Sequence, residues 1–168
     1  GADYLGFVFV EGVRRQLTPE SGAEIIAEFR RERGPDGPKL VGLFANQPAD
    51  FVNRVASDCG LDYAQLCGDE RPGYWGQVAT GIIKQIKVRV DGDDRDAAIA
   101  RTVVQVDEVL AAGHRALLDA FEPGHLGGTG RSFDWAIAKA VAHDRQVVLA
   151  GGLTPENVEE AIATVAPW

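Results

Sequence analysis

The chain alternates six times between a short apolar run and an amphipathic stretch, and this alternation limits the fold more than any other feature. The apolar runs are rich in Val, Ile, Leu and Phe and nearly continuous, which is typical of strands buried on both faces of a parallel sheet. They occupy residues 4–10, 40–45, 63–67, 82–88, 115–121 and 146–150. Strands that alternate with helices indicate an α/β fold with right-handed crossovers.

The stretches between these runs have a helical spacing and marked helix starts. Thr18-Pro19-Glu20 and Thr154-Pro155-Glu156 each place a capping hydroxyl before a proline at the first helical position. Proline and glycine interrupt residues 70–80, which predicts a short or irregular helix there. The apolar stripes expected to face the core are Val52-Val55-Ala56-Cys59, Ile99-Val103-Val106-Leu110 and Val158-Ala161-Ile162-Val165.

Two architectures fit this alternation. A length of 168 residues favours a complete doubly wound open sheet, because a complete (β/α)8 barrel needs about 200 residues or more. Functional residues of an open sheet gather at one switch point, whereas those of a barrel follow every strand. The polar or glycine residues at the predicted strand ends are Arg14-Arg15, Asn46, Cys67-Gly68-Asp69, Asp119 and Gly151-Gly152. Their distribution favours the TIM (β/α)8-barrel family, with about six consecutive βα units in one domain over residues 1–168.

Asp119 is the most informative single residue. It follows Leu117 and Leu118 inside a predicted buried strand, where a carboxylate is costly unless it is paired or used. One interpretation is a loop cap or a partner of an arginine. The other is a general acid or base whose pKa is tuned by partial burial.

Two glycine-rich segments are candidate phosphate sites. Gly151-Gly152 shortly precedes a predicted helix, and backbone N–H groups at such a turn can bind an anion, although a simple tight turn fits equally well. Gly127-Gly128-Thr129-Gly130 follows the Asp119 strand and permits close approach of a ligand. Arg14-Arg15 is either a solvated pair or a bidentate site for a carboxylate.

The net charge and the cysteine content limit the classes of ligand and partner that the protein is expected to bind. A net charge of −8 and a pI near 4.8 argue against a nucleic-acid or anionic-membrane surface but permit an anionic small-molecule substrate. Cys59 and Cys67 form neither a disulfide framework nor a metal cluster, and no P-loop or dinucleotide motif occurs. No apolar stretch approaches the roughly 20 residues that span a bilayer. We therefore expect a cytoplasmic protein without metal or cofactor.

Several segments together resemble the phosphoribosylanthranilate isomerase family, in order and over essentially the whole chain. These segments are Gly6-Phe7-Val8-Phe9, Arg14-Arg15, Val41-Gly42-Leu43-Phe44-Ala45-Asn46, Leu61-Asp62-Tyr63-Ala64-Gln65-Leu66, Leu117-Leu118-Asp119, Gly127-Gly128-Thr129-Gly130, Phe133-Asp134-Trp135 and Ala150-Gly151-Gly152-Leu153-Thr154-Pro155-Glu156-Asn157-Val158. The resemblance implies a cofactor-free Amadori rearrangement in tryptophan biosynthesis, which converts N-(5-phosphoribosyl)anthranilate to 1-(2-carboxyphenylamino)-1-deoxyribulose 5-phosphate.

The resemblance also implies residue roles. Asp119 is the expected general acid, which protonates the furanose ring oxygen. Arg15 is expected to hold the anthranilate carboxylate. Gly151 and Gly152, with Gly128 nearby, are expected to bind the phosphate.

Three departures from the family pattern qualify this expectation. The family's general base is a cysteine in a Lys-Ile-Cys-Gly type motif on the first strand, and this chain begins after that strand. The chain also stops before the family's last strand, with its Asp-Val-Ser-Ser-Gly segment. Cys67 takes the place of a usual histidine in the substrate site, and a thiol is a poorer donor than imidazole. We therefore expect a barrel domain truncated at both ends and inactive as it stands.

Three alternatives are also compatible with the sequence. One is a different barrel isomerase that acts on a related ribulose phosphate. Another is a non-catalytic, phosphate-binding open-sheet module. A third is that the chain derives from a fused protein that carries a second tryptophan-pathway activity, or works beside such an enzyme.

Overall fold

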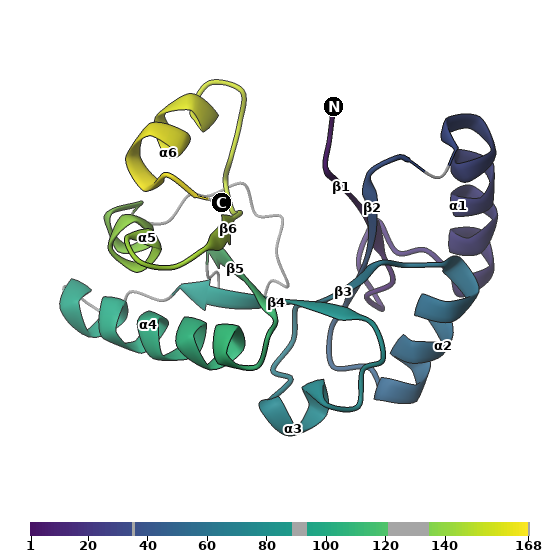
Figure 1. Cartoon of the computed structure of the whole chain (residues 1–168), viewed down its shortest axis with the longest axis horizontal. Helices are drawn as coiled ribbons and strands as arrows, with labels where there is room; N and C mark the ends of the chain where they lie inside the picture. Colours follow the sequence, from purple (N-terminus) through teal and green to yellow (C-terminus); the bar gives the residue numbers. More distant parts are fainter. Residues whose placement is uncertain (35, 89–93, 121–134, 168) are drawn as a thin grey trace. The chain divides into compact units, whose positions relative to one another are not determined.

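The structure, a computed structural model, describes residues 1–34, 36–88, 94–120 and 135–167. Along these residues strands and helices alternate strictly, as the apolar runs predicted (Figure 1). The strands are β1 (Tyr4–Val8), β2 (Lys39–Phe44), β3 (Tyr63–Leu66), β4 (Gly81–Val88), β5 (Arg115–Ala120) and β6 (Val147–Leu149). The helices are α1 (Pro19–Arg33), α2 (Ala49–Cys59), α3 (Pro72–Trp75), α4 (Arg95–Ala111), α5 (Trp135–Ala142) and α6 (Val158–Val165).

The strands follow one another in the sheet in the order of the chain, β1-β2-β3-β4-β5-β6. The pairs β1–β2, β2–β3 and β5–β6 are parallel, with Val8 opposite Leu43, Phe44 opposite Leu66 and Leu118 opposite Leu149. A doubly wound open sheet reverses its strand order at a switch point, whereas a (β/α)8 barrel does not. The order without a reversal therefore confirms the barrel-type fold class over the open sheet.

The chain forms two compact units, Gly1–Ile83 and Lys84–Trp168, whose boundary falls within β4. In the first unit, α1 and α2 pack on each other along one side of β1–β3 (Figure 1). In the second unit, α4, α5 and α6 pack in succession, and α4 also contacts β5. A single domain over residues 1–168 stays a prediction.

Phe44 is the centre of the apolar core in the first unit. Its side chain is fully buried, lies parallel to the Phe9 ring at 5.5 Å between centroids, and meets the Phe51 ring edge-on at 6.5 Å. The α2 stripe predicted from its spacing is buried against this core, including Val52 and Val55 at 0% exposure. Burial of this stripe accounts for the docking of α2, because packing of an amphipathic face stabilises a helix more than propensity does.

The predicted helix starts are confirmed in one case and corrected in the other. The Thr18 hydroxyl accepts from the Ser21 N–H at 3.2 Å, and the Ser21 hydroxyl accepts from the Thr18 N–H at 3.0 Å, so Thr18 caps α1 as expected. The helix expected directly after Thr154 instead begins at Val158. Thr154 N–H donates to the side chain of Asn157 at 2.8 Å, so the intervening residues form a turn.

The predicted stripe of α4 is partly wrong, because the buried residues are Ala98, Thr102, Val106 and Val109. The Thr102 hydroxyl donates to the Ala98 carbonyl at 2.8 Å, which satisfies it and permits its burial. In α6, Ala161 and Val165 are buried, but Val158 and Ile162 are 36% and 58% exposed. The short helix predicted within residues 70–80 is confirmed as the four-residue α3.

Candidate active site

Asp119 lies near the carboxyl end of β5 and is 8% exposed. β5 pairs with β6 so that Leu118 lies opposite Leu149, and the Ala150 N–H donates to the Leu118 carbonyl at 2.8 Å. Asp119 therefore lies level with Ala150, the residue that directly precedes Gly151. The pairing of β5 with β6 thus brings the candidate acid and the candidate phosphate turn onto neighbouring strand ends.

The Gly151-Gly152 turn has a conformation that favours glycine. The two residues have φ angles of 88° and 65°, a region where a side chain is strained. Asn157, at the start of α6, donates from its side chain to the Gly152 carbonyl at 2.9 Å. This bond, together with the contact of Asn157 to Thr154, ties the turn to α6. Asn157 is a residue whose structural role the sequence patterns did not reveal.

Gln85 is a neighbour of Asp119 that sequence reasoning missed. It lies in β4, is 5% exposed, and its side-chain Nε2 donates to Asp119 Oδ2. The pair Lys84-Gln85 interrupts the apolar residues of β4, and both side chains are buried. That interruption was the available signal, since polar residues inside a buried strand need partners.

Of the other predicted site residues, Arg14, Arg15 and Cys67 are described by the structure, whereas Gly128 is not. Arg14 and Arg15 are exposed in the turn that follows β1, and Cys67 directly follows β3. Because β1, β2 and β3 are parallel, these residues lie at the same end of the strands. Gly128, with the rest of the segment 127–130, lies outside the described residues. The roles of all these residues in binding stay predictions.

Cys67 is 3% exposed, and its thiol has a hydrogen-bond partner at the end of β3. Gln65 Nε2 lies 3.4 Å from Cys67 Sγ, and the Cys67 N–H donates to the Phe44 carbonyl at 2.7 Å. A ligand in contact with Cys67 must therefore reach a buried sulfur atom.

Glu70 is a second buried polar residue that the sequence patterns did not single out. Its Oε1 accepts from the Asn46 N–H at 2.7 Å and the Gly68 N–H at 3.3 Å, and its side chain is buried. The Glu70 carboxylate thus joins the loop after β2 to the loop after β3. A Cβ at Gly68 would lie 2.4 Å from Asn46 Oδ1 and 2.7 Å from Glu70 Oε1, so a side chain there would displace the two side chains that join the loops.

Replacement of Glu70 by Leu is expected to expose the Cys67 thiol. The change leaves two backbone N–H groups without their acceptor, at a cost of about 1–3 kcal/mol each, so the loop after β3 opens locally. Alkylation of Cys67, followed by mass spectrometry of its peptide, should accelerate roughly 10- to 100-fold.

Cys59 serves as the internal control for this experiment, because it is buried in α2 away from the loop. Its labelling rate should stay unchanged, and Glu70→Gln, which keeps the Oε1 acceptor, should behave like the wild type. Equal acceleration at both cysteines would show global destabilisation and refute the local role of Glu70.

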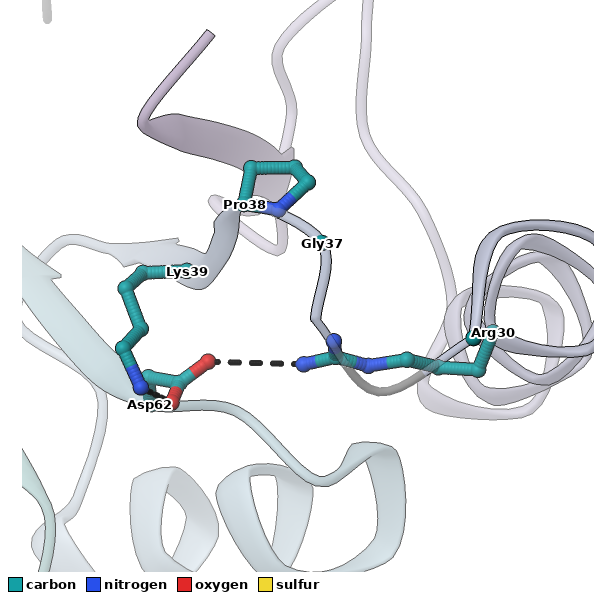
Figure 2. A pocket seen from close by; sticks show the side chains of 6 residues that line it. Arg30, Gly37, Pro38, Lys39 and Asp62 are labelled. Atoms are coloured by element: carbon teal, nitrogen blue, oxygen red, sulfur yellow. Dashed lines mark hydrogen bonds and ion pairs between the residues drawn. The ribbon is translucent and has the colours of Figure 1, made fainter.

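A hollow of about 440 Å³ lies at the opposite end of the strands in the first unit (Figure 2). Asp62, just before β3, accepts from Lys39 Nζ at 2.9 Å and from the Leu40 N–H at 2.8 Å, and lies 3.5 Å from Arg30 Nη2. The amino-terminal ends of strands in this fold class serve stability, whereas chemistry takes place at the carboxyl ends. We therefore interpret the Arg30–Asp62–Lys39 cluster as a clamp between α1, β2 and β3.

The Asp62 clamp is expected to make stability depend on acid pH. Burial raises the pKa of the Asp62 carboxyl, but the Leu40 N–H and the Lys39 and Arg30 charges outweigh it and hold the pKa below its ordinary value. The stabilisation is therefore complete above the pKa of the unfolded state and is lost as the pH falls through the lower folded-state pKa.

Urea unfolding at pH 7 and pH 3 measures this effect. Asp62→Asn should shrink the difference in unfolding free energy between the two pH values, whereas the exposed control Asp58→Asn should not. An unchanged difference in Asp62→Asn would show that the clamp does not contribute.

Within the described part of the chain, no three His, Cys, Asp or Glu side chains come together as a metal site. None of its helices combines the length and the apolarity that crossing a membrane requires.

Comparison with known proteins identifies the family. The model of the family described as N-(5'phosphoribosyl)anthranilate (PRA) isomerase matches residues 1–168. The N-(5'-phosphoribosyl)anthranilate isomerase of Citrifermentans bemidjiense is 46% identical over 168 residues, which cover 100% of this chain and 74% of the relative.

Solved structures agree with the sequence comparison. The crystal structure of phosphoribosyl anthranilate isomerase from Thermus thermophilus aligns with a TM-score of 0.76 at 33% identity, over 99% of this chain and 74% of that one. A phosphoribosyl anthranilate isomerase in complex with reduced 1-(o-carboxyphenylamino)-1-deoxyribulose 5-phosphate aligns with a TM-score of 0.76 at 29% identity, over 99% and 73%. The chain therefore belongs to the N-(5'-phosphoribosyl)anthranilate isomerase family of (β/α)8-barrel enzymes.

Proposed function

We propose that Asp119 is the general acid of the isomerase reaction, that Arg15 binds the anthranilate carboxylate, and that the Gly151-Gly152 turn binds the phosphate. The reaction of the family is the rearrangement of N-(5-phosphoribosyl)anthranilate to 1-(2-carboxyphenylamino)-1-deoxyribulose 5-phosphate in tryptophan biosynthesis. Gly128 remains a further phosphate-binding candidate, and Cys67 a further substrate-binding one.

The chemistry requires one acid and one base. Protonation of the ring oxygen by Asp119 lets the bond from that oxygen to C1 break, while the nitrogen lone pair forms a C1=N iminium ion. Removal of the C2 proton by a base then gives an enaminol, which tautomerises to the ketone product. The reaction is an internal redox change, so its balance requires no external oxidant or reductant. We assign the base to neither cysteine, because Cys59 packs in α2 and Cys67 Sγ contacts Gln65.

One observation carries this proposal: a buried carboxylate lies on the strand next to the Gly151-Gly152 turn and level with its start. The ring oxygen and the phosphorus of the substrate are separated by four covalent bonds. The through-space distance that four such bonds span is comparable to the spacing of neighbouring strands, about 4.8 Å. A phosphate at the turn would therefore place the ring oxygen within reach of Asp119.

The two neighbouring arginines provide a matched test. In the full-length gene product, Arg15→Ala should raise the KM for the anthranilate substrate roughly 10- to 100-fold, because a charge-assisted bond to its carboxylate is lost. Arg14→Ala is the control and should leave KM unchanged, since both residues are exposed in the same turn. With phosphoribosylaniline, which lacks the carboxylate, the KM of Arg15→Ala should be close to that of the wild type. Equal effects of both substitutions would overturn the role of Arg15, and lack of turnover by the wild type would overturn the function.

We further propose that the protein acts in the cytoplasm, beside or fused to another enzyme of the tryptophan pathway. Its two cysteines are buried as free thiols, which supports a reducing compartment. An enzyme that transfers phosphoribosyl to anthranilate must supply the substrate, and an enzyme that acts on the ring-opened ketone must consume the product. Co-purification of such an enzyme with the full-length gene product tests this proposal.

A further inference from the structure

Gln85 presents an unsatisfied polar atom next to the proposed general acid. Its Nε2 donates to Asp119 Oδ2, and its side chain is 5% exposed. The Gln85 Oε1 atom is buried and has no hydrogen-bond partner among the residues that the structure describes. A buried amide oxygen without a partner destabilises a fold, and most such groups are hydrogen-bonded. This exception needs an explanation.

We propose that Gln85 is a positioning residue for Asp119 and that its Oε1 accepts a hydrogen bond from a hydroxyl group of the sugar substrate. The inference rests on the proposed role of Asp119 as general acid. An amide oxygen can only accept a hydrogen bond, so the group that completes it must carry an O–H or N–H. The ribose moiety of the substrate supplies hydroxyl groups on C2, which loses its proton in the reaction, and on the neighbouring C3.

The two ends of one rigid amide would then fix the acid and the sugar relative to each other. The donor end, Nε2, engages Asp119 Oδ2 and so fixes the orientation of the carboxyl group that carries the proton to be transferred. The acceptor end, Oε1, engages the substrate. Because both strands β4 and β5 are regular elements, the amide is held by rigid backbone, which favours catalytic precision.

Two substitutions of Gln85 separate its role as a donor to Asp119 from its role as an acceptor for the substrate. Gln85→Met has a similar length and removes both the donor and the acceptor. Gln85→Glu keeps an acceptor and loses the donor. Gln105→Leu, on the exposed side of α4, is a control outside the site. All are made in the full-length gene product, with thermal unfolding to establish that each variant is folded.

We expect Gln85→Met to lower kcat and raise KM, each roughly 10-fold or more. The pH profile adds a readout that a purely structural role would not move. Donation to a carboxylate favours its charged form, so loss of the donor raises the pKa of Asp119. A general acid works while it is protonated, so the basic limb of the kcat profile should move to higher pH. Besides Asp119 itself, the charged residues described on these two strands are Lys84 and Lys87 on β4 and Arg115 on β5, and none is changed.

Gln85→Glu should shift the basic limb in the same direction, because it replaces the donor by a second carboxyl, while its KM stays closer to that of the wild type. Should Gln85→Met fail to fold, Gln85→Glu alone decides, since it keeps the size and polarity of the side chain. Wild-type kcat, KM and pH profile in the folded variants would overturn the inference. If Asp119→Asn abolishes turnover while the Gln85 variants behave like the wild type, the proposed function is supported and only the proposed role of Gln85 is wrong. If Asp119→Asn retains turnover, the proposed role of Asp119 and the proposed role of Gln85 are both wrong.

Discussion

Replacement of Asp119 by Asn in the full-length gene product is expected to lower kcat by roughly 10²- to 10⁴-fold. Asparagine has the shape of aspartate but holds no acidic proton to give to the ring oxygen. The substitution leaves the proposed contacts of the substrate with the Gly151-Gly152 turn and with Arg15 unchanged, so KM should change only a few-fold. Steady-state rates of product formation measure both constants, and a loss confined to kcat is the mark of an interaction made in the transition state.

The control for this substitution is Asp58→Asn, which removes a carboxylate from the exposed face of α2. Its kinetic constants should equal those of the wild type. Thermal unfolding of Asp119→Asn should show a folded protein, because the amide can still accept from Gln85. Ordinary turnover by Asp119→Asn would remove Asp119 from the mechanism, and the buried carboxylate would then be a structural partner of Gln85.

Replacement of Phe44 by Ala is expected to lower the free energy of unfolding by about 3–5 kcal/mol. The ring is fully buried between Phe9 and Phe51, so its removal loses the transfer free energy of the ring and leaves a cavity. The Phe44 carbonyl also accepts from the Cys67 N–H, so a shift of β2 would disturb the strand end that carries Cys67. Urea unfolding followed by circular dichroism measures the loss.

Val104→Ala provides the comparison, because Val104 is 67% exposed on α4. Its unfolding free energy should stay within about 0.5 kcal/mol of the wild type. A loss at Phe44 no larger than that at Val104 would show that the first unit does not depend on the aromatic cluster. Phe44→Leu should fall between the two, since it keeps most of the apolar volume.

The parts of the structure that local sequence determined are those that depend on neighbours a few residues away. The continuous apolar runs were sufficient to predict six strands, because a strand buried on both faces needs no polar alternation. The Thr18-Pro19 start of α1 and the interruption of the helix around Pro72 follow from local hydrogen bonding and from restrictions on φ. The carboxylate at Asp119 was conspicuous for a similar reason, since its two preceding leucines predicted burial.

Only the tertiary structure decided which residues meet at the strand ends. Gln85 and Asp119 are 34 residues apart, and Asn46 and Glu70 are 24 apart, so their contacts arise from strand pairing and loop packing that no local pattern encodes. The same holds for the shifted stripe of α4, where the Thr102 hydroxyl is buried because its bond to Ala98 satisfies it. Sequence periodicity records the apolarity of each residue, whereas burial of a polar group depends on whether a distant partner completes its hydrogen bonds.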